Sequence, residues 1–243
     1  MAWSLFQFFV VVLSLVPASA CTSRNAPQEP VELKARVFLF QEQEKDIDPY
    51  PVRMLVTADF LRMDEGSAND DFLLFDRKKQ VVFSVNRDTQ SYYRFERRNV
   101  GRDGKRKPKL TVADNDVSDM PLFQGKKPRY RTYFANGDRC LDVVSAPGFD
   151  EDAVAAIRGY LNVMSDEHAA TLDQTPRDMQ ADCMLADFVY APVRHLNDGF
   201  PLREWDYRGY SRTLIDVGEE TVRTSLFELP EGYQQANTVA GRE

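Results

Sequence analysis

The chain has 243 residues, enough for one large domain or two small ones with a sizeable core. Hydrophobic residues make up 43% and charged residues 28%, the balance of an ordinary globular protein rather than a disordered or fibrous one. The formal net charge of -7 argues against a general affinity for nucleic acid or anionic lipid surfaces, and the 12% of aromatic residues favours sheets over helical bundles.

The first 20 residues have the pattern of a secretory signal peptide. Residues 5–16 form an apolar run that is short for a bilayer span, and Ala18-Ser19-Ala20 supplies an A-x-A cleavage site. No later apolar run in the sequence has the length of a membrane span. We therefore expect residues 1–20 to be removed on export.

Cys21 follows the expected cleavage site, and here the sequence resembles the lipidation signal of bacterial lipoproteins. It departs from that signal at Ala18, where Leu is preferred. The other cysteines are Cys140 and Cys183, so lipidation of Cys21 leaves an even pair. This parity favours a periplasmic protein tethered to the outer membrane only through lipidated Cys21. The alternative is a plain periplasmic protein that begins at Cys21.

Residues 21–30 are polar and contain proline, which predicts a flexible tether, and the fold begins at Val31. Alternation of apolar and polar side chains over residues 31–40 predicts a first strand. Residues 52–95 contain short alternating runs separated by clusters of turn-forming residues. This pattern is typical of a meander of short antiparallel strands.

A basic segment follows the meander, over residues 97–109. One interpretation is a patch for phosphates, lipid headgroups or an acidic partner, and the other is a solvated loop. No aromatic side chains are interleaved with the cations for stacking on bases, so we expect no nucleic-acid partner. The candidate patch consists of Arg97, Arg98, Arg102, Lys105, Arg106, Lys107 and Lys109.

A hairpin and then helices are predicted in the second half of the chain. Asn136-Gly137 lies between two alternating runs, which is a strong signal for a tight hairpin turn. Asp150 can cap a helix with apolar residues at helical spacing, and Thr175-Pro176 predicts the start of a second helix that presents Met179 and Cys183 on one face. We expect a helical insert from about residue 150 to 186.

Cys140 falls on the strand after the predicted hairpin turn and Cys183 on the second predicted helix. In an oxidising compartment we expect these two cysteines to form a structural disulfide, because no C-x-x-C spacing points to a redox pair. Strands resume at residues 201–207, 211–217 and 221–224, and the polar residues 234–243 are predicted to be a disordered tail. Residues 31–233 would then form a single domain.

The predicted fold class is α+β and mainly β, with a curved antiparallel sheet and a helical insert. The patterns LRMD…FLLFDR (residues 61–77) and SLFELPEGY (residues 225–233), together with the signal peptide, resemble the LolA/LolB-like half-barrel superfamily. That group includes lipoprotein carriers and receptors, anti-sigma-factor regulators and many exported proteins. The resemblance implies a half-barrel whose hollow holds acyl chains or a peptide. We expect no cofactor, since the sequence has no glycine-rich phosphate-binding motif.

Candidate residues lining such a hollow are the alternating apolar ones, although packing in a filled core is an alternative for most of them. They are Val37, Leu39, Met54, Val56, Leu61, Met63, Phe72, Leu74, Phe83, Val85 and Tyr93.

The sequence contains no catalytic or metal-binding motif that we recognise. There is no G-x-S-x-G elbow, and His168 and His195 lack the spacing of metal ligands. We therefore expect a non-catalytic protein that binds a lipid, an acyl chain or a protein segment. The alternatives are an envelope module for protein interaction or stress sensing, and a hydrolase that uses His195.

Overall fold

The computed structural model describes residues 31–67, 69–102 and 106–237. These residues belong to one compact unit, Val31–Glu243. The predicted signal peptide, Cys21 and the tether lie outside the described residues, as do Lys105 of the basic segment and residues 238–243 of the predicted tail.

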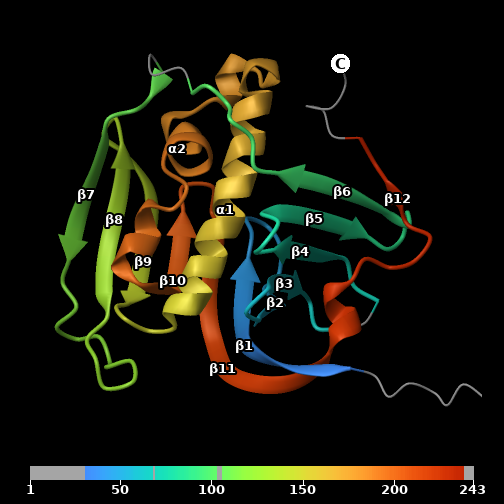
Figure 1. Ribbon diagram of the computed structural model, residues 1–243. Helices are drawn as coiled ribbons and strands as arrows, with labels where there is room; N and C mark the ends of the chain where they lie inside the picture. Colours follow the sequence, from blue (N-terminus) through green and yellow to red (C-terminus); the bar gives the residue numbers. More distant parts are fainter. Residues whose placement is uncertain (1–30, 68, 103–105, 238–243) are drawn as a thin grey trace, which may run out of the picture. The chain divides into compact units, whose positions relative to one another are not determined.

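The described part of the chain is mainly β, which confirms the predicted fold class at that level (Figure 1). Twelve strands form one open sheet in the order β12-β6-β5-β4-β3-β2-β1-β11-β10-β9-β8-β7. All neighbouring strands are antiparallel except β12 and β6, so the sheet is mixed rather than purely antiparallel. The strands are β1 (Glu32–Gln43), β2 (Tyr50–Val56), β3 (Phe60–Asp64), β4 (Phe72–Asp76), β5 (Val81–Asn86), β6 (Ser91–Glu96), β7 (Leu110–Asn115), β8 (Arg129–Ala135), β9 (Asp138–Ala146), β10 (Phe200–Asp206), β11 (Ser211–Arg223) and β12 (Gln234–Gln235).

The meander predicted from residues 52–95 is present as β2 to β6, each strand paired with the next. On its other edge, β1 pairs with β11. Strand β11 is one continuous strand, where the sequence indicated two separate segments. Strand β7 was not predicted, because its residues are half-buried or exposed and carry no apolar alternation.

The predicted hairpin turn joins β8 and β9. Asn136 and Gly137 both have positive φ, 49° and 99°. These angles suit the tight turn that connects two twisted antiparallel strands, and Asn and Gly adopt them at low cost. The prediction at this position is confirmed.

The long helix α1 (Glu151–Thr171) begins where the sequence predicted a cap. The Asp150 carboxylate accepts a hydrogen bond from the backbone N–H of Ala153 at 3.1 Å, which satisfies one free donor of the first turn. The guanidinium of Arg36 on β1 donates to the same carboxylate at 2.8 Å. The start of α1 is thereby attached to the middle of the sheet.

The second predicted helix is not continuous. After α1 the chain forms short turns, then α2 (Asp182–Met184) and a π-helical segment, η4 (Leu185–Tyr190). Met179 is 63% exposed whereas Cys183 is buried, so the two do not share a packed helical face. The cap and proline at Thr175-Pro176 begin only a single 3-10 turn, because few apolar side chains follow to bury it.

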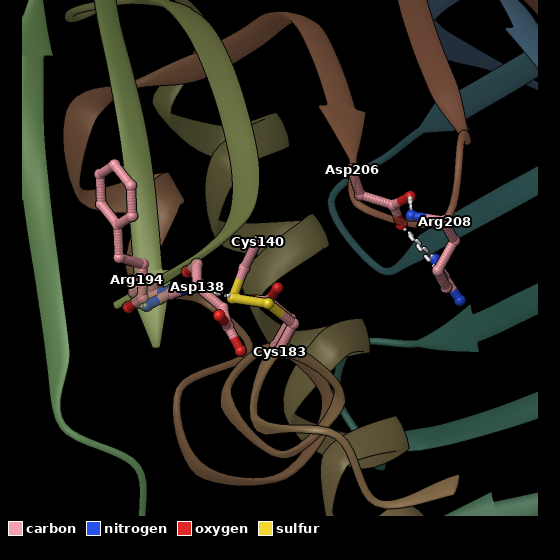
Figure 2. The surroundings of a disulfide bond; sticks show 8 residues. Asp138, Cys140, Cys183, Arg194, Asp206 and Arg208 are labelled. Carbon is pink, nitrogen blue, oxygen red and sulfur yellow. Dashed lines mark hydrogen bonds and ion pairs between the residues drawn. A yellow bond between two sulfur atoms is a disulfide. The ribbon is translucent and has the colours of Figure 1, made fainter. Parts of the chain in front are cut away.

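The disulfide between Cys140 and Cys183 is present, as predicted (Figure 2). It joins β9 to α2 across 43 positions of sequence. Leu141 follows the first cysteine and the π-helical segment begins two residues after the second. The bond therefore fixes two pieces of chain that both reach the cavity described below.

The two larger apolar cores of the described residues lie on opposite faces of the sheet. The helix face packs Phe38, Met54 and Phe75 against α1. The outer face packs Val37, Leu55 and other side chains beneath the C-terminal segment of residues 226–233. That segment ends in β12, which pairs with β6, so the predicted disordered tail is wrong for Gln234 and Gln235.

Gly159 allows α1 to lie close to the sheet. A Cβ atom at this position would lie 2.8 Å from Cε1 and Cζ of the buried Phe75 ring. We expect Gly159→Ala to lower the free energy of unfolding by about 1–3 kcal/mol through overpacking. Urea unfolding would measure this, with Gly218→Ala as the control because a Cβ there meets no atom within 4 Å. Equal stability of the two variants would contradict the expected crowding.

Candidate ligand-binding cavity

A cavity of about 440 Å³ lies between α1, the π-helical segment and the helix face of the sheet. Its volume is in the range of small-molecule binding sites. The residues of its wall are Glu42, Val52, Met54, Leu61, Met63, Leu73, Leu141, Ile157, Tyr160, Leu161, Met164, Ser165, His168, Asp187, Phe188, Pro192, His195, Pro201, Glu204, Asp206, Arg208, Tyr210 and Arg212.

One part of the wall is apolar and flexible. Strands β2, β3 and β4 contribute side chains that share the helix face because their positions are paired, as in Met54 with Met63 and Met63 with Leu73. Helix α1 contributes Leu161 and Met164 from the other side. The unbranched thioether side chains of methionine adapt to irregular apolar partners.

Another part of the wall is a row of three charged side chains on neighbouring strands. Arg212 on β11 is paired with Glu204 on β10 and with Glu42 on β1. Side chains opposite each other on adjacent strands point to the same face, so two carboxylates flank one guanidinium. We call Glu204, Arg212 and Glu42 the charged row.

Arg212 is held against an aromatic ring and an acid, yet two of its nitrogens make no hydrogen bond. Its guanidinium carbon lies 3.6 Å from the centroid of the Phe40 ring, in a cation–π contact. Its Nε lies 3.2 Å from Oε1 of Glu42, an ion pair without hydrogen-bond geometry. Both Nε and Nη2 are buried and lack a hydrogen-bond partner among the described residues.

Burial shifts the titration of the groups around the charged row. It raises the pKa of the Glu42 carboxyl, and the guanidinium of Arg212 offsets this only in part. Burial also raises the pKa of the Tyr160 hydroxyl to about 12 and that of Tyr210 above its usual value. The row thus lies in a region where charge is poorly solvated and electrostatic interactions are strong.

His195, the histidine named above for a possible hydrolase, is brought into this cavity. Its Nε2 lies 3.3 Å from Oε1 of Glu204. Burial lowers the pKa of the His195 imidazole, while the neighbouring Glu204 carboxylate acts in the opposite direction. The hydrolase itself stays a prediction.

His168 lies elsewhere in the wall, on α1. Its ring packs edge-on against Phe188 with centroids 5.4 Å apart, and burial lowers the pKa of its imidazole. The guanidinium of Arg208 stacks on the Phe188 ring, with 4.8 Å between its carbon and the ring centroid. Arg208 also pairs with Asp206 at 2.6 Å (Figure 2). Half of the Arg208 side chain is exposed, so the cavity meets solvent here.

The π-helical segment supplies Asp187 and Phe188 to the wall. The backbone N–H of Ala191 donates to the carbonyl of Ala186 at 2.8 Å, the five-residue spacing of a π-helix. Such segments are rare and frequent at functional sites. Asp187 forms an ion pair with Arg194 at 2.8 Å, although burial still raises the pKa of its carboxyl.

Three of the candidate lining residues, Met54, Leu61 and Met63, are in the wall of this cavity. Val56 lies in the packed core of the helix face, while Leu39 and Tyr93 are 41% exposed. The remaining five are on the outer face, in or against its apolar core: Val37, Phe72, Leu74, Phe83 and Val85. Since both faces of these strands are apolar, alternation did not reveal which side chains share a face with Met54.

Much of the basic segment is neutralised by α1 rather than free for a partner. Arg97 and Arg102 each form an ion pair at 2.8 Å with Asp166, whose side chain is 1% exposed. Arg98 pairs with Glu167 at 3.4 Å. Lys107 and Lys109 are exposed and Arg106 is half-buried.

The described residues contain no group of three or more His, Cys, Asp or Glu side chains placed to hold a metal ion. Among the described helices, none combines the length and apolar character needed to cross a membrane.

No protein-family profile matches the chain, and no curated protein matches it. An uncharacterised conserved protein from Thermus thermophilus aligns over 83% of this chain and 89% of its own, with 9% identity and a TM-score of 0.41. Two crystal forms of PNGF-II align over 85% of this chain with TM-scores of 0.40 and 0.39 and identities of 9% and 8%. The chain spans 32% of the length of PNGF-II. These likenesses are too distant to carry an argument about function.

Proposed function

We propose that the protein is an exported, non-catalytic binding protein that holds the acyl chain of a lipid in this cavity. The observation that carries the proposal is the division of its wall, with flexible apolar side chains in one part and the buried charged row in another. An amphipathic ligand with one chain and one polar head matches such a division.

In this proposal the open sheet acts as a half-barrel around α1, the arrangement implied by the resemblance to LolA/LolB-like proteins. Export to the bacterial periplasm and tethering through lipidated Cys21 belong to the same proposal. Their support is the sequence pattern of residues 1–21 and the disulfide, which is compatible with an oxidising compartment. A protein segment as ligand, and an envelope interaction or stress-sensing role, are alternative outcomes of the test.

The test is native mass spectrometry of the purified chain, followed by solvent extraction. We expect a lipid to co-purify, or an added twelve-carbon lipid to bind, at one molecule per chain. Met63→Trp places a bulky ring in the apolar part of the cavity, so we expect it to abolish this binding without loss of thermal stability. Ile215→Trp is the matched control, because Ile215 is 60% exposed and lies outside the cavity wall.

The control variant should bind as the unmodified chain does. Equal binding by both tryptophan variants would place any bound lipid outside this cavity. If the protein keeps the mass of the unliganded chain in the presence of fatty acid, monoacylglycerol and phospholipid, the proposed lipid binding is overturned. The ligand would then have to be sought among proteins.

A further inference from the structure

The charged row restricts the chemistry of the head group that the cavity can bind. This inference rests on the proposed binding function. Two carboxylates, Glu42 and Glu204, stand against one guanidinium, Arg212. The other two acids of the cavity wall have their own arginines: Asp187 pairs with Arg194 and Asp206 with Arg208. Ionised in full, the row therefore carries an excess of one negative charge.

A ligand anion would meet this excess where water cannot screen it. The side chains of Glu42 and Arg212 are each 13% exposed and that of Glu204 is 14% exposed. Like charges repel strongly in such a medium. The favourable partner for Arg212 is already present in Glu42, so a carboxylate or phosphate brought to the row gains little and is repelled by both glutamates.

The hydrogen-bonding capacity that the row offers to a ligand is mainly that of an acceptor. Nε and Nη2 of Arg212 have no acceptor among the described residues, but both nitrogens are buried and present almost no surface to the cavity. The oxygens of Glu42 and Glu204 are acceptors with spare capacity, since a carboxylate offers about four lone-pair sites. A head group that donates hydrogen bonds to these oxygens would therefore be stabilising.

We infer that the cavity discriminates against acyl chains with an anionic head group and favours a head group that donates hydrogen bonds to the glutamates, as the glycerol of a monoacylglycerol does. The hydroxyl groups of the glycerol donate to Glu42 and Glu204, whereas an ionised carboxylate has no proton to donate. A fatty acid of equal chain length is discriminated against at the head, not along the chain.

The experiment compares three ligands with the same twelve-carbon chain on the full chain near neutral pH: monolauroylglycerol, laurate and dodecylamine. Calorimetry or displacement of a fluorescent probe measures each affinity below micelle-forming concentrations. We expect monolauroylglycerol to bind on the order of tenfold more tightly than laurate, which corresponds to about 1.4 kcal/mol. Binding of laurate that is at least as tight as that of monolauroylglycerol or of dodecylamine would overturn the inference and leave the acyl-binding function standing.

A pair of substitutions tests whether the charged row causes the selectivity. Glu42→Gln with Glu204→Gln removes both negative charges, so laurate should gain on the order of tenfold while monolauroylglycerol changes by less than about threefold. Glu219→Gln with Glu220→Gln is the matched control. Both side chains lie on β11, the strand of Arg212, but they are exposed and outside the cavity wall. Unchanged selectivity in the first pair would also overturn the inference, whereas failure of all three ligands to bind would overturn the proposed function itself.

Discussion

Asp64→Ala is expected to lower the free energy of unfolding by about 3–5 kcal/mol, because it leaves a buried charge without its partner. Asp64 on β3 accepts hydrogen bonds from Arg62 at 2.6 Å and from Arg53 at 2.9 Å. The Arg62 side chain is 2% exposed, and its guanidinium also stacks on the Phe72 ring at 3.7 Å. Without the carboxylate, the Arg62 guanidinium stays buried at the core of the outer face, and no carboxylate among the described residues neutralises its charge.

Urea unfolding measures this effect, with Asp88→Ala as the control for an aspartate exposed in the turn between β5 and β6. The control should change stability by less than about 0.5 kcal/mol. A loss in Asp64→Ala no larger than that of the control would show that the Arg62 guanidinium finds water or another acceptor.

The same site predicts a pH dependence. Burial opposes ionisation of Asp64, but hydrogen bonds from Arg53 and Arg62 outweigh it, so the pKa of the folded carboxyl lies below its usual value. A lowered folded pKa contributes stability that is present above the unfolded pKa, about 3.9, and is lost as pH falls through the folded pKa. The stability difference between the unmodified chain and Asp64→Asn should therefore shrink below about pH 4. A difference that stays constant there would contradict the shift.

Replacing both Cys140 and Cys183 by serine is expected to lower the free energy of unfolding by about 4 kcal/mol in the chain-entropy description. The bond closes a loop of 43 positions, and its loss lets the unfolded chain explore many more conformations. We also expect weaker ligand binding, since Leu141 and the π-helical segment next to the two cysteines form part of the cavity wall.

Reduction provides the matched control for this pair. A reducing agent should destabilise the unmodified chain by about as much as the double substitution does, and it should not change the double variant further. Full stability of the reduced chain would contradict a structural role for the disulfide.

Where local chemistry determines the conformation, the sequence was informative about the fold. Asn136-Gly137 turns the chain because of its own backbone preferences, and Asp150 caps a helix a few residues away. The strands of the meander were visible because their apolar residues alternate. Strand β7 was not visible, because it forms by pairing with β8 and its residues are half-buried or exposed. The helix expected at Thr175 ends after one turn, because few apolar side chains follow to bury it.

The cavity was predicted far less well. Met54, Leu61 and Met63 were among the candidate lining residues, yet alternation could not separate them from Leu74 or Val85 on the other face. The charged row had no signal at all. Glu42 lies 162 residues before Glu204 and 170 before Arg212, and only the pairing of β1 with β11 brings it to them.

The pairing of β1 with β11 also affects the order in which the strands of the sheet can pair. Strands β1 and β11 share the longest ladder in the sheet, from Glu32 opposite Arg223 to Gln43 opposite Ser211. Strand β1 borders the strands β2 to β6 on its other side, and β11 borders β10 to β7. A chain made from its amino end therefore holds β1 with one edge unpaired until β11 has been added. Because closure of so large a loop is entropically costly, we expect the pairing of β1 with β11, and the charged row that crosses it, to form late in folding.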